Sequence, residues 1–380
     1  METEIKKYDC AIIGGGLGGL CLAIQLADAG VSVVLFEKKR FPFHKVCGEY
    51  ISMESWGFIE KLGVPLRDMS LPRITELGIS SEKGFMLNRQ LEPGGFGISR
   101  YTLDQKLYEK AISKGVNVVE GAKVNGIEHQ DGIWEIETSS GKFRADITCG
   151  SYGKYTPSFV QQLPGYEDVQ KAGKPNYIGV KYHVRTDLNV NRIELHNFRD
   201  GYCGISRVDG GRYCMCYLTS SKNLHDFDMS IKTMEEQVLY KNPFLKRYFT
   251  GSDFLFSQPL VVSNVEFHKK QTEVNGMFLL GDAAGSITPL CGNGMSMAMR
   301  SSQLLGAELI GYFRNKTSRD DIADRYQVAW NRHFGTRIRA GYYLQYLFGK
   351  RTLTDISLRL LNQLPQVTDR FIALTHGDNF

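Results

Sequence analysis

The chain has 380 residues, of which 42% are hydrophobic and 23% are charged, and its formal net charge is +5. This composition predicts a globular protein with enough apolar material for two domains, and the mild charge does not indicate a nucleic-acid partner. The eight cysteines are scattered without a CxxC pair, so no metal site is predicted, and reduced thiols in the cytoplasm are expected. The charged start METEIKKYDC leads directly into a predicted strand and shows no signal peptide.

Residues 8–37 are predicted to form a strand, a glycine-rich turn, a helix and a second strand. In this GxGxxG pattern Gly14 permits the tight turn, Gly16 lets the backbone approach a pyrophosphate, and Gly19 lets helix and strand pack closely. The helix N-terminus offers N–H groups to the phosphates. Glu37 ends the second strand and can accept hydrogen bonds from a ribose diol. A chance glycine-rich turn is the alternative, but the whole unit predicts a dinucleotide site.

The following elements are predicted in chain order from apolar periodicity and turn residues. A loop covers 38–50 and a helix 52–62, and short strands within 73–98 have turns at 82–84 and 93–95. An amphipathic helix covers 101–114, and strands recur at 116–120, 123–128, 133–138 and 142–148. Between 174 and 264 alternating segments predict an antiparallel sheet with one wet face, interrupted by a helix at 230–240.

A buried strand is predicted again near 277–282, followed by a helix from about 293 to 313 and a mostly helical remainder. The nucleotide-binding domain is therefore expected to be discontinuous, with ranges 1–72, 98–173 and 265–315. A sheet domain for the substrate is expected from 73–97 and 174–264, and a helical region from 316–380. Five tyrosines lie on the predicted sheet strands, and most are expected to be packing residues, with one or two lining a pocket: Tyr177, Tyr182, Tyr202, Tyr213 and Tyr217.

A second motif, GDAAGSITPLCGNGM, covers residues 281–295. Asp282 follows an apolar strand, so its carboxylate is expected at a strand end facing a cleft, where it can bind a polyol such as a ribityl chain. The next residues lead into a helix whose N-terminus can stabilise negative charge on a reduced flavin ring: Pro289, Gly292, Asn293, Gly294 and Met295. An ordinary strand–loop–helix is the alternative interpretation of this segment.

Together, GGGLGG…E, Arg100-x-x-x-Asp104 and GDAAG…GNGM resemble the FAD-dependent oxidoreductases of the p-hydroxybenzoate-hydroxylase fold, which include aromatic hydroxylases, geranylgeranyl reductases and halogenases. The resemblance implies an α/β fold: a Rossmann-like FAD domain, an inserted antiparallel substrate sheet and a helical C-terminus. It implies that the ADP portion is held by Gly14, Gly16, Gly19, Glu37 and Arg100. Asp282 would hold the ribityl and pyrophosphate, and Gly292, Asn293, Gly294 and Met295 would lie at the isoalloxazine. Arg40 would lie beside the adenosine or be a solvated surface residue.

The loop at 41–52 contains Lys45-x-Cys47-Gly48, which resembles the KxCG element of geranylgeranyl reductases. By this resemblance Lys45 and Cys47 are the candidate catalytic residues. Lys45 would offset negative charge on reduced flavin, and Cys47 would sit over the ring. The alternative is a structural loop with a packed thiol. The adjacent His44 is either an acid–base group or, as we favour, an incidental loop residue.

The sequence departs from these relatives in three places. The stretch 148–153 lacks the aspartate of an Asp-Gly motif, which leaves nicotinamide handling open. Tyr202 is kept where prenyl reductases carry YxWxFP, but the Trp, Phe and Pro are missing. None of the three tryptophans lies in a WxWxIP motif, so halogenation is disfavoured.

The resemblance leaves three functions open. The leading prediction is an NADPH- or NADH-dependent monooxygenase that hydroxylates an aromatic or polyene small molecule through a flavin C4a-hydroperoxide. The first alternative is a C=C reductase acting on a prenyl or lipid substrate, and the second is a flavin-binding redox protein without turnover. Residues 331–351 contain five Lys/Arg and no acidic residue among several aromatics. This segment either contacts an anionic membrane or, as we favour, packs on the FAD domain.

Overall fold

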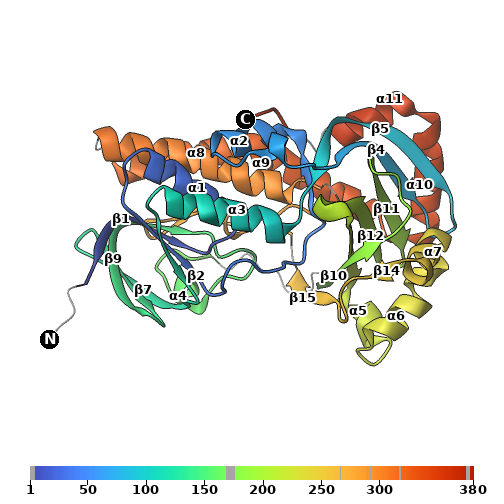
Figure 1. Cartoon of the computed structure of the whole chain (residues 1–380), viewed down its shortest axis with the longest axis horizontal. Helices are drawn as coiled ribbons and strands as arrows, with labels where there is room; N and C mark the ends of the chain where they lie inside the picture. Colours follow the sequence, from blue (N-terminus) through green and yellow to red (C-terminus); the bar gives the residue numbers. More distant parts are fainter. Residues whose placement is uncertain are drawn as a thin grey trace.

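The computed structural model describes residues 5–167, 176–265, 267–288, 290, 292–315, 318–373 and 377–380, without the side chains of 315 and 344–347. Two sheets lie side by side along the long axis, and long C-terminal helices run over both of them (Figure 1). The predicted α/β class, with a nucleotide-type sheet, a second sheet and a helical C-terminus, is confirmed. Among the residues described, no helix has the length and apolarity needed to cross a bilayer.

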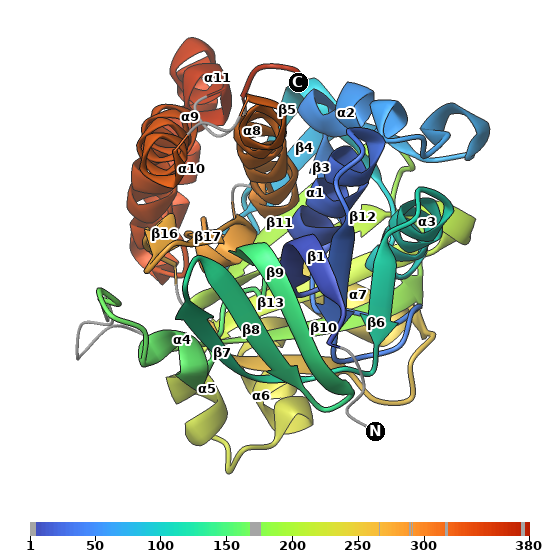
Figure 2. The same ribbon diagram turned by 90° about the vertical axis from the view of Figure 1, so that its left-hand side faces the viewer.

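The first sheet has the strand order β16-β17-β9-β1-β2-β6, with β7 and β8 added antiparallel beside β9. Its parallel centre is buried on both faces, which explains the unbroken apolar runs of these strands. Helices α1, α3 and α8 lie on one face of it (Figure 2). The strands are β1 (Lys7–Ile13), β2 (Val33–Glu37), β6 (Asn117–Glu120), β7 (Val124–Gln130), β8 (Ile133–Thr138), β9 (Gly141–Gly150), β16 (Glu273–Val274) and β17 (Met277–Leu279).

The second sheet has the order β14-β10-β13-β12-β11-β4-β5-β3, with β15 beside β10. All its pairs are antiparallel except β11 with β4. The strands are β3 (Tyr50–Ser52), β4 (Arg73–Ser80), β5 (Met86–Gly97), β10 (Tyr177–Arg185), β11 (Arg192–Phe198), β12 (Gly201–Arg207), β13 (Tyr213–Ser220), β14 (Asp253–Phe254) and β15 (Leu260–Val265). β3 belongs to this sheet although it lies within the predicted range 1–72, so the proposed domain boundaries remain a prediction.

Most helices correspond to predicted ones with shifted ends, whereas the short helices at 158–161, 221–225 and 243–251 were not predicted. Residues 53–55 form a 3-10 turn, so the helix predicted at 52–62 begins only at Trp56. The helices are α1 (Leu17–Asp28), α2 (Trp56–Lys61), α3 (Arg100–Ser113), α4 (Ser158–Gln161), α5 (Ser221–His225), α6 (Ile231–Gln237), α7 (Pro243–Gly251), α8 (Gly294–Asn315), α9 (Arg319–Leu347), α10 (Arg351–Gln363) and α11 (Pro365–Ala373).

Two further predictions are wrong, and the favoured packing of the C-terminal aromatics on the FAD domain is confirmed only in part. The second sheet has no wet face at its centre, because β10 and β13 are buried on both sides, with α5–α7 covering one of them. The turn predicted at 93–95 is absent, because β5 continues through it with Gly94 at φ +76° beside a register shift. In the C-terminal segment Phe334 is buried against Trp330, whereas Tyr342 and Tyr343 are exposed.

A buried carboxyl lies beneath the second sheet. Glu235 of α6 accepts hydrogen bonds from the hydroxyls of Tyr182 (2.9 Å) and Tyr217 (2.8 Å). Burial raises the pKa of Glu235 from 4.5 to about 7, and the two hydroxyls oppose this shift only in part. Because the folded chain holds this proton more tightly than the unfolded chain, stability is expected to fall as the pH rises from about 4.5 to 7.

Glu235→Gln should therefore stabilise the protein above neutral pH by up to about 3 kcal/mol and flatten this pH dependence. Urea unfolding of both proteins across the acidic to neutral range measures the effect. Glu128→Gln, at an exposed position on β7 of the first sheet, is the control and should leave the slope unchanged. Equal slopes in the wild type and Glu235→Gln would show that this carboxyl is not the titrating group.

Candidate functional site

The glycine-rich turn between β1 and α1 contains Gly14, Gly16 and Gly19. Only Gly16 has open space where a side chain would be. A Cβ atom at Gly14, which has φ +110°, would lie 2.3 Å from the carbonyl oxygen of Ser151. A Cβ at Gly19 would lie 2.1 Å from the carbonyl oxygen of Gly14. A Cβ at Gly16, the N-cap of α1, would meet nothing within 4 Å. Gly14 and Gly19 thus serve packing, while Gly16 borders a space at a helix N-terminus that suits a phosphate.

The acidic residue at the end of β2 faces this turn. Glu37 is 8% exposed, and its two carboxylate oxygens accept hydrogen bonds from the backbone N–H groups of Gly15 and Lys39, each at 3.0 Å. Each oxygen has a second lone pair, so the carboxylate can still accept ribose hydroxyls. Arg40 is exposed and lies next to Gly121. This position fits both interpretations of Arg40, as a residue beside the adenosine and as a solvated surface residue.

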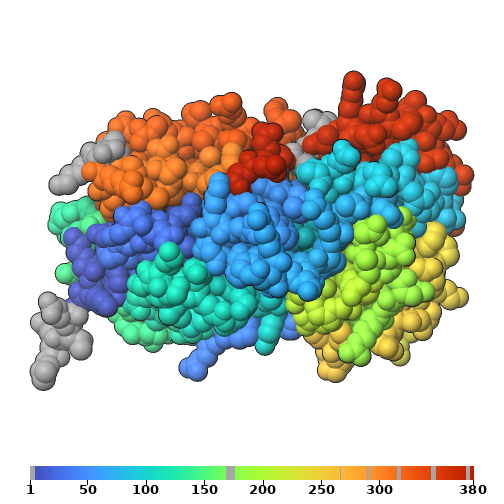
Figure 3. Space-filling view, turned by 45° about the horizontal axis from the view of Figure 1, so that its top comes forward, coloured from blue at the N-terminus to red at the C-terminus, as the bar shows by residue number. Residues whose placement is uncertain are grey.

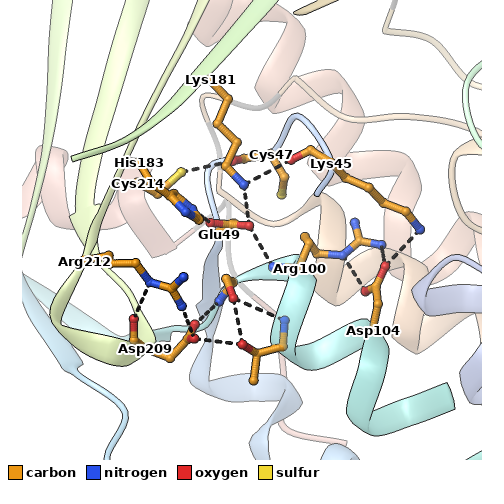
Figure 4. Close-up of polar contacts among 12 residues, drawn as sticks. Lys45, Cys47, Glu49, Arg100, Asp104, Lys181, His183, Asp209, Arg212 and Cys214 are labelled. Carbon is orange, nitrogen blue, oxygen red and sulfur yellow. Dashed lines mark hydrogen bonds and ion pairs between the residues drawn. The ribbon is translucent and has the colours of Figure 1, made fainter. Parts of the chain in front are cut away.

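A buried carboxylate at the start of α3 binds two cationic side chains (Figure 4). Asp104 pairs with the Arg100 guanidinium through both oxygens, at 2.7 and 2.8 Å, and with the Lys45 ammonium at 2.9 Å. Burial alone would raise the pKa of Asp104, but the two cations hold it below its usual value. Lys45 is therefore already paired. The trio still carries one net positive charge, which can attract a phosphate or the anionic form of a reduced ring.

A second buried cluster was not predicted from the sequence. Glu49, which has φ +57°, binds the Lys181 ammonium at 2.5 Å and His183 Nε2 at 2.6 Å, and all three are fully buried. The same carboxylate accepts the backbone N–H of Arg100 at 2.7 Å. Although burial opposes it, hydrogen bonding from His183 and the charge of Lys181 hold the pKa of Glu49 low. Lys181 and His183 lie two residues apart on the mostly apolar strand β10, so their side chains point to the same face. This spacing is the sequence signal that could have revealed them.

This cluster holds the Lys45–Cys47 loop against the second sheet (Figure 4). The Lys181 ammonium donates to the carbonyl of Lys45 at 3.1 Å, and the Cys214 thiol donates to the carbonyl of Cys47 at 3.2 Å. Glu49, His183 and Cys214 lie close enough together to share a metal ion. The Lys181 ammonium already neutralises that carboxylate, so a cation would have to compete with it.

A third contact ties the second sheet to α3. Asp209, in the turn between β12 and β13, accepts the backbone N–H of Ser99 at 2.5 Å and the hydroxyl of Thr102 at 2.8 Å. Its carboxylate also pairs with Arg212 at 2.7 Å. Burial would raise the pKa of Asp209, but these donors keep it below its usual value. Arg212 thus helps to hold Asp209 against Ser99, the N-cap residue of α3.

The second motif lies where β17 meets α8. Asp282 is partly exposed in a 3-10 turn (Gly281–Ala283), and the Gly281 N–H donates to Ser301 Oγ at 2.9 Å. Asp282 borders a narrow hollow together with Gly294, Met297 and Trp330. Pro289 lies outside the described residues, as does Cys291. Asp282 thus follows a short strand and borders this hollow, and its contact with a ribityl chain stays a prediction.

The Lys45–Cys47 loop meets the start of α8, far away in the sequence. The Cys47 sulfur lies 3.5 Å from the Met295 sulfur. Gly292 has φ +68°, and a Cβ there would lie 3.1 Å from the ring of Tyr50. Asn293 is fully buried just before α8, which begins at Gly294. The structure therefore brings together the loop and the motif that the resemblance assigned to the flavin ring. His44 packs against the rings of Tyr101, His183 and Phe256.

Polar atoms around this junction suit a heteroaromatic ligand. The hydroxyls of Tyr50, Thr288 and Ser296 are buried and have no hydrogen-bond partner among the described residues. Buried polar groups are almost always paired, so unpaired ones point to a missing partner. A flavin ring offers carbonyl oxygens and an N–H to such groups. With the space at Gly16 and the acceptor Glu37, the residues present fit FAD.

The inner face of the second sheet forms an apolar wall. One cluster consists of Tyr50, Ile74, Leu77 and Leu91, with Ile79, Ile193 and Leu195 packed against it. A second includes Tyr202, Leu218, Val265 and Leu290, with Tyr177 packed against it. Tyr182, Tyr213 and Tyr217 point into the core on the opposite face. Only Tyr177 and Tyr202 of the five tyrosines thus lie on the inner side.

Comparisons with known proteins agree with this geometry. Residues 7–142 match the family model described as a FAD binding domain. A digeranylgeranylglycerophospholipid reductase of Methanopyrus kandleri is 22% identical over 399 residues, covering 98% of this chain and 93% of that protein. Conditioned medium factor receptor 1 of Dictyostelium discoideum is 26% identical over 360 residues, covering 86% and 68%. The solved structure of a flavin-dependent brominase superposes with a TM-score of 0.80 at 17% identity, covering 97% and 93%.

The fold and the site thus define a flavoprotein with a FAD-binding domain and a second, mostly antiparallel sheet. Residues 7–142 thus form a domain of the FAD binding domain family, and the chain is a FAD-dependent oxidoreductase whose sequence is similar to geranylgeranyl reductases. Its fold is similar to those of a halogenase and a FAD-dependent monooxygenase.

Proposed function

We propose that the protein reduces carbon–carbon double bonds in a prenyl or other lipid substrate. The observation that carries this proposal is the meeting of the Lys45–Cys47 loop with the start of α8, next to an apolar wall on the second sheet. An apolar wall suits a hydrocarbon chain, because burying such a chain contributes about 0.8 kcal/mol per methylene. The likeness to a lipid reductase along nearly the whole chain supports the same substrate class.

The roles proposed for the residues are those that the resemblance to FAD-dependent oxidoreductases implies. Gly16, Glu37 and Arg100 would hold the ADP part of FAD at the turn that Gly14 and Gly19 shape. Arg40 would lie near the adenosine, and Asp282 would hold the ribityl chain. Gly292, Asn293, Gly294 and Met295 would line the ring, with Pro289 beside them. FAD, when bound and reduced, supplies a hydride. The Cys47 thiol would give its proton to the neighbouring carbon and regain one from water, while Lys45 with Arg100 would keep the site electropositive.

NADPH or NADH is the proposed electron donor, and the cytoplasm is the proposed location. The seven cysteines described carry free thiols, in keeping with a reducing compartment. The substrate is proposed to be a small hydrophobic molecule, and no nucleic-acid partner is proposed.

Hydroxylation of an aromatic or polyene substrate is the second candidate. The segment from Tyr202 to Arg207 favours it, because it lacks the Trp, Phe and Pro of the prenyl reductases. The two reactions differ in their need for oxygen. A reductase forms a product with two added hydrogens without oxygen, whereas a hydroxylase consumes oxygen and adds one oxygen atom. Product analysis with NADPH or NADH, with and without oxygen, distinguishes them.

Cys47→Ala tests the proposed proton donor. We expect turnover of a prenyl lipid to fall about 100-fold or more, the usual contribution of a positioned acid, while FAD content stays unchanged. Cys203→Ala is the control, because that buried thiol lies in the core on the opposite face of the sheet. Unchanged turnover in Cys47→Ala would show that Cys47 is not the proton donor. The reductase activity itself is tested separately, by the product analysis with and without oxygen.

A further inference from the structure

A cavity of about 280 Å³ lies beside the FAD-binding motifs and is not used by the site described above. Its walls come from two segments, 152–167 after β9 and 264–271 before β16. Leu279, the last residue of β17, and Ala283 complete the lining. The cavity thus lies beyond the carboxyl ends of β9 and β17, which are neighbouring parallel strands. Ligands of nucleotide-type sheets bind at this edge.

The cavity and the helices of the FAD-binding domain lie on different sides of the first sheet. α1, α3 and α8 form part of the face seen in Figure 3. α4, whose last residue Gln161 lines the cavity, lies on the opposite side of the sheet (Figures 1 and 2). The two sites are still neighbours, because Ala283 directly follows Asp282. A second ligand could therefore bind in the cavity while FAD lies at the N-terminus of α1.

Three tyrosine rings line the cavity: Tyr152, Tyr155 and Tyr166. Tyr155 is 48% exposed, and its hydroxyl donates to the carbonyl of Ser263, which holds the ring beside the edge strand β15. Flat heteroaromatic rings stack on aromatic side chains. The rings therefore suit a ligand with such a group, as a nicotinamide or an adenine has.

The charged side chains narrow the ligand to a nucleotide. The Lys154 ammonium lies 5.4 Å from the centre of the Phe267 ring and forms no ion pair in the part of the chain that the structure describes. The exposed Glu167 borders the same cavity. A carboxylate would repel a simple polyanion, and a hydrocarbon would satisfy neither charge. A nucleotide satisfies both, because its phosphate can meet the lysine and its ribose diol the carboxylate.

Hydrogen bonds between the two segments hold the walls in place. Lys270 donates to the carbonyl of Lys154 at 2.7 Å. Gln271 accepts the backbone N–H of Glu167 at 2.9 Å and donates to the carbonyl of Gly165 at 2.8 Å. The lining residues are thus already ordered, which lowers the entropy cost of binding.

We propose that this cavity binds the nicotinamide nucleotide that serves as electron donor, with Lys154 on a phosphate, Glu167 on a ribose and the tyrosines against a flat ring. The donor would give a hydride to oxidised FAD and leave as NADP⁺ or NAD⁺. The cavity is close to the lower limit of about 300 Å³ for small-ligand sites, so one half of the dinucleotide would fill it. This inference rests on the proposed electron donor and is independent of which substrate FAD acts on.

Binding of oxidised nucleotides to the FAD-loaded full chain tests the proposal without turnover. Calorimetric titration with NADP⁺ and NAD⁺ gives both affinities, and bound FAD keeps the nucleotide out of the FAD site. Lys154→Gln should weaken binding of the preferred nucleotide about 10-fold or more, the usual effect of losing a charge-assisted contact. Tyr155→Ala should weaken it about 5-fold or more through lost stacking. Lys142→Gln is the matched control, because Lys142 is exposed at the other end of β9.

A second measurement assigns the cavity to one half of the reaction. Reduction of FAD by subsaturating NADPH or NADH should slow in Lys154→Gln as much as binding weakens. Reoxidation of the dithionite-reduced variant by oxygen should keep the wild-type rate, because no nucleotide takes part in it.

Absence of nucleotide binding to the wild type would overturn the proposal, as would equal binding by Lys154→Gln. Binding of geranylgeranyl phosphate that Lys154→Gln weakens, without any binding of nucleotides, would instead assign the cavity to a lipid headgroup. Because no lipid takes part in the nucleotide titration, its result can fail or succeed independently of the reductase activity.

Discussion

Gly16→Ala is expected to weaken FAD binding about 10- to 150-fold while leaving the chain folded. The new methyl group meets no protein atom within 4 Å, and the backbone at φ −80° accepts alanine. The methyl would instead fill the space where a phosphate approaches the N-terminus of α1. Loss of one charge-assisted hydrogen bond costs about 1.5–3 kcal/mol, which gives that range of affinity. Titration of the apoprotein with FAD, followed by flavin fluorescence, measures it.

Two controls separate the phosphate site from folding. Gly335→Ala, in α9, also meets no atom within 4 Å and should bind FAD as the wild type does. Gly19→Ala should instead unfold the protein, since its Cβ would lie 2.1 Å from the Gly14 carbonyl oxygen. Wild-type affinity in Gly16→Ala would show that the pyrophosphate lies elsewhere.

Glu49→Gln is expected to destabilise the protein by about 3–5 kcal/mol, because it leaves the fully buried Lys181 ammonium without its counter-charge. The replacement keeps the size of the side chain, so the loss reports charge and not a cavity. Chemical denaturation monitored by circular dichroism gives the free energy of unfolding. The Lys45–Cys47 loop should also loosen, since Lys181 donates to the carbonyl of Lys45.

A double-mutant cycle isolates the ion pair. Lys181→Met combined with Glu49→Gln should recover much of the lost stability, because neither buried charge remains. The exposed pair of Lys106 and Glu109 is the comparison, and Glu109→Gln should cost less than about 0.5 kcal/mol. Additive effects of the two buried substitutions would mean that Glu49 and Lys181 do not stabilise one another.

The parts of the site that are continuous in the chain could be predicted from the sequence. The turn from Gly14 to Gly19 and the placement of Glu37 follow from one strand–helix–strand unit of about 30 residues, whose geometry is set locally. Asp282 could be placed for the same reason, since a short apolar strand precedes it. Return of the chain to the first sheet was also predictable, and β17 does pair with β9.

The parts that depend on contacts between distant segments could not be predicted. Glu49 follows β2, whereas Lys181 and His183 lie on β10, more than 130 residues later, and nothing local links them. The pairing of Lys45 with Asp104 was missed for the same reason. The wet face was a wrong expectation because periodicity cannot show that α5–α7 cover one side of the central strands and that the Lys45–Cys47 loop lies against the other. Exposure of Tyr342 and Tyr343 likewise depends on where α9 ends relative to its neighbours.

Reoxidation of the reduced protein by a lipid, without oxygen, tests the proposed function most directly. The FAD-loaded protein is reduced with dithionite, freed of excess reductant and mixed anaerobically with a geranylgeranyl lipid in a stopped-flow instrument. We expect the oxidised flavin absorbance to return in a single phase, the lipid to gain two hydrogens, and Cys47→Ala to slow this phase. A flavin that stays reduced until oxygen is admitted, with an oxygenated product appearing only then, would contradict the proposed function.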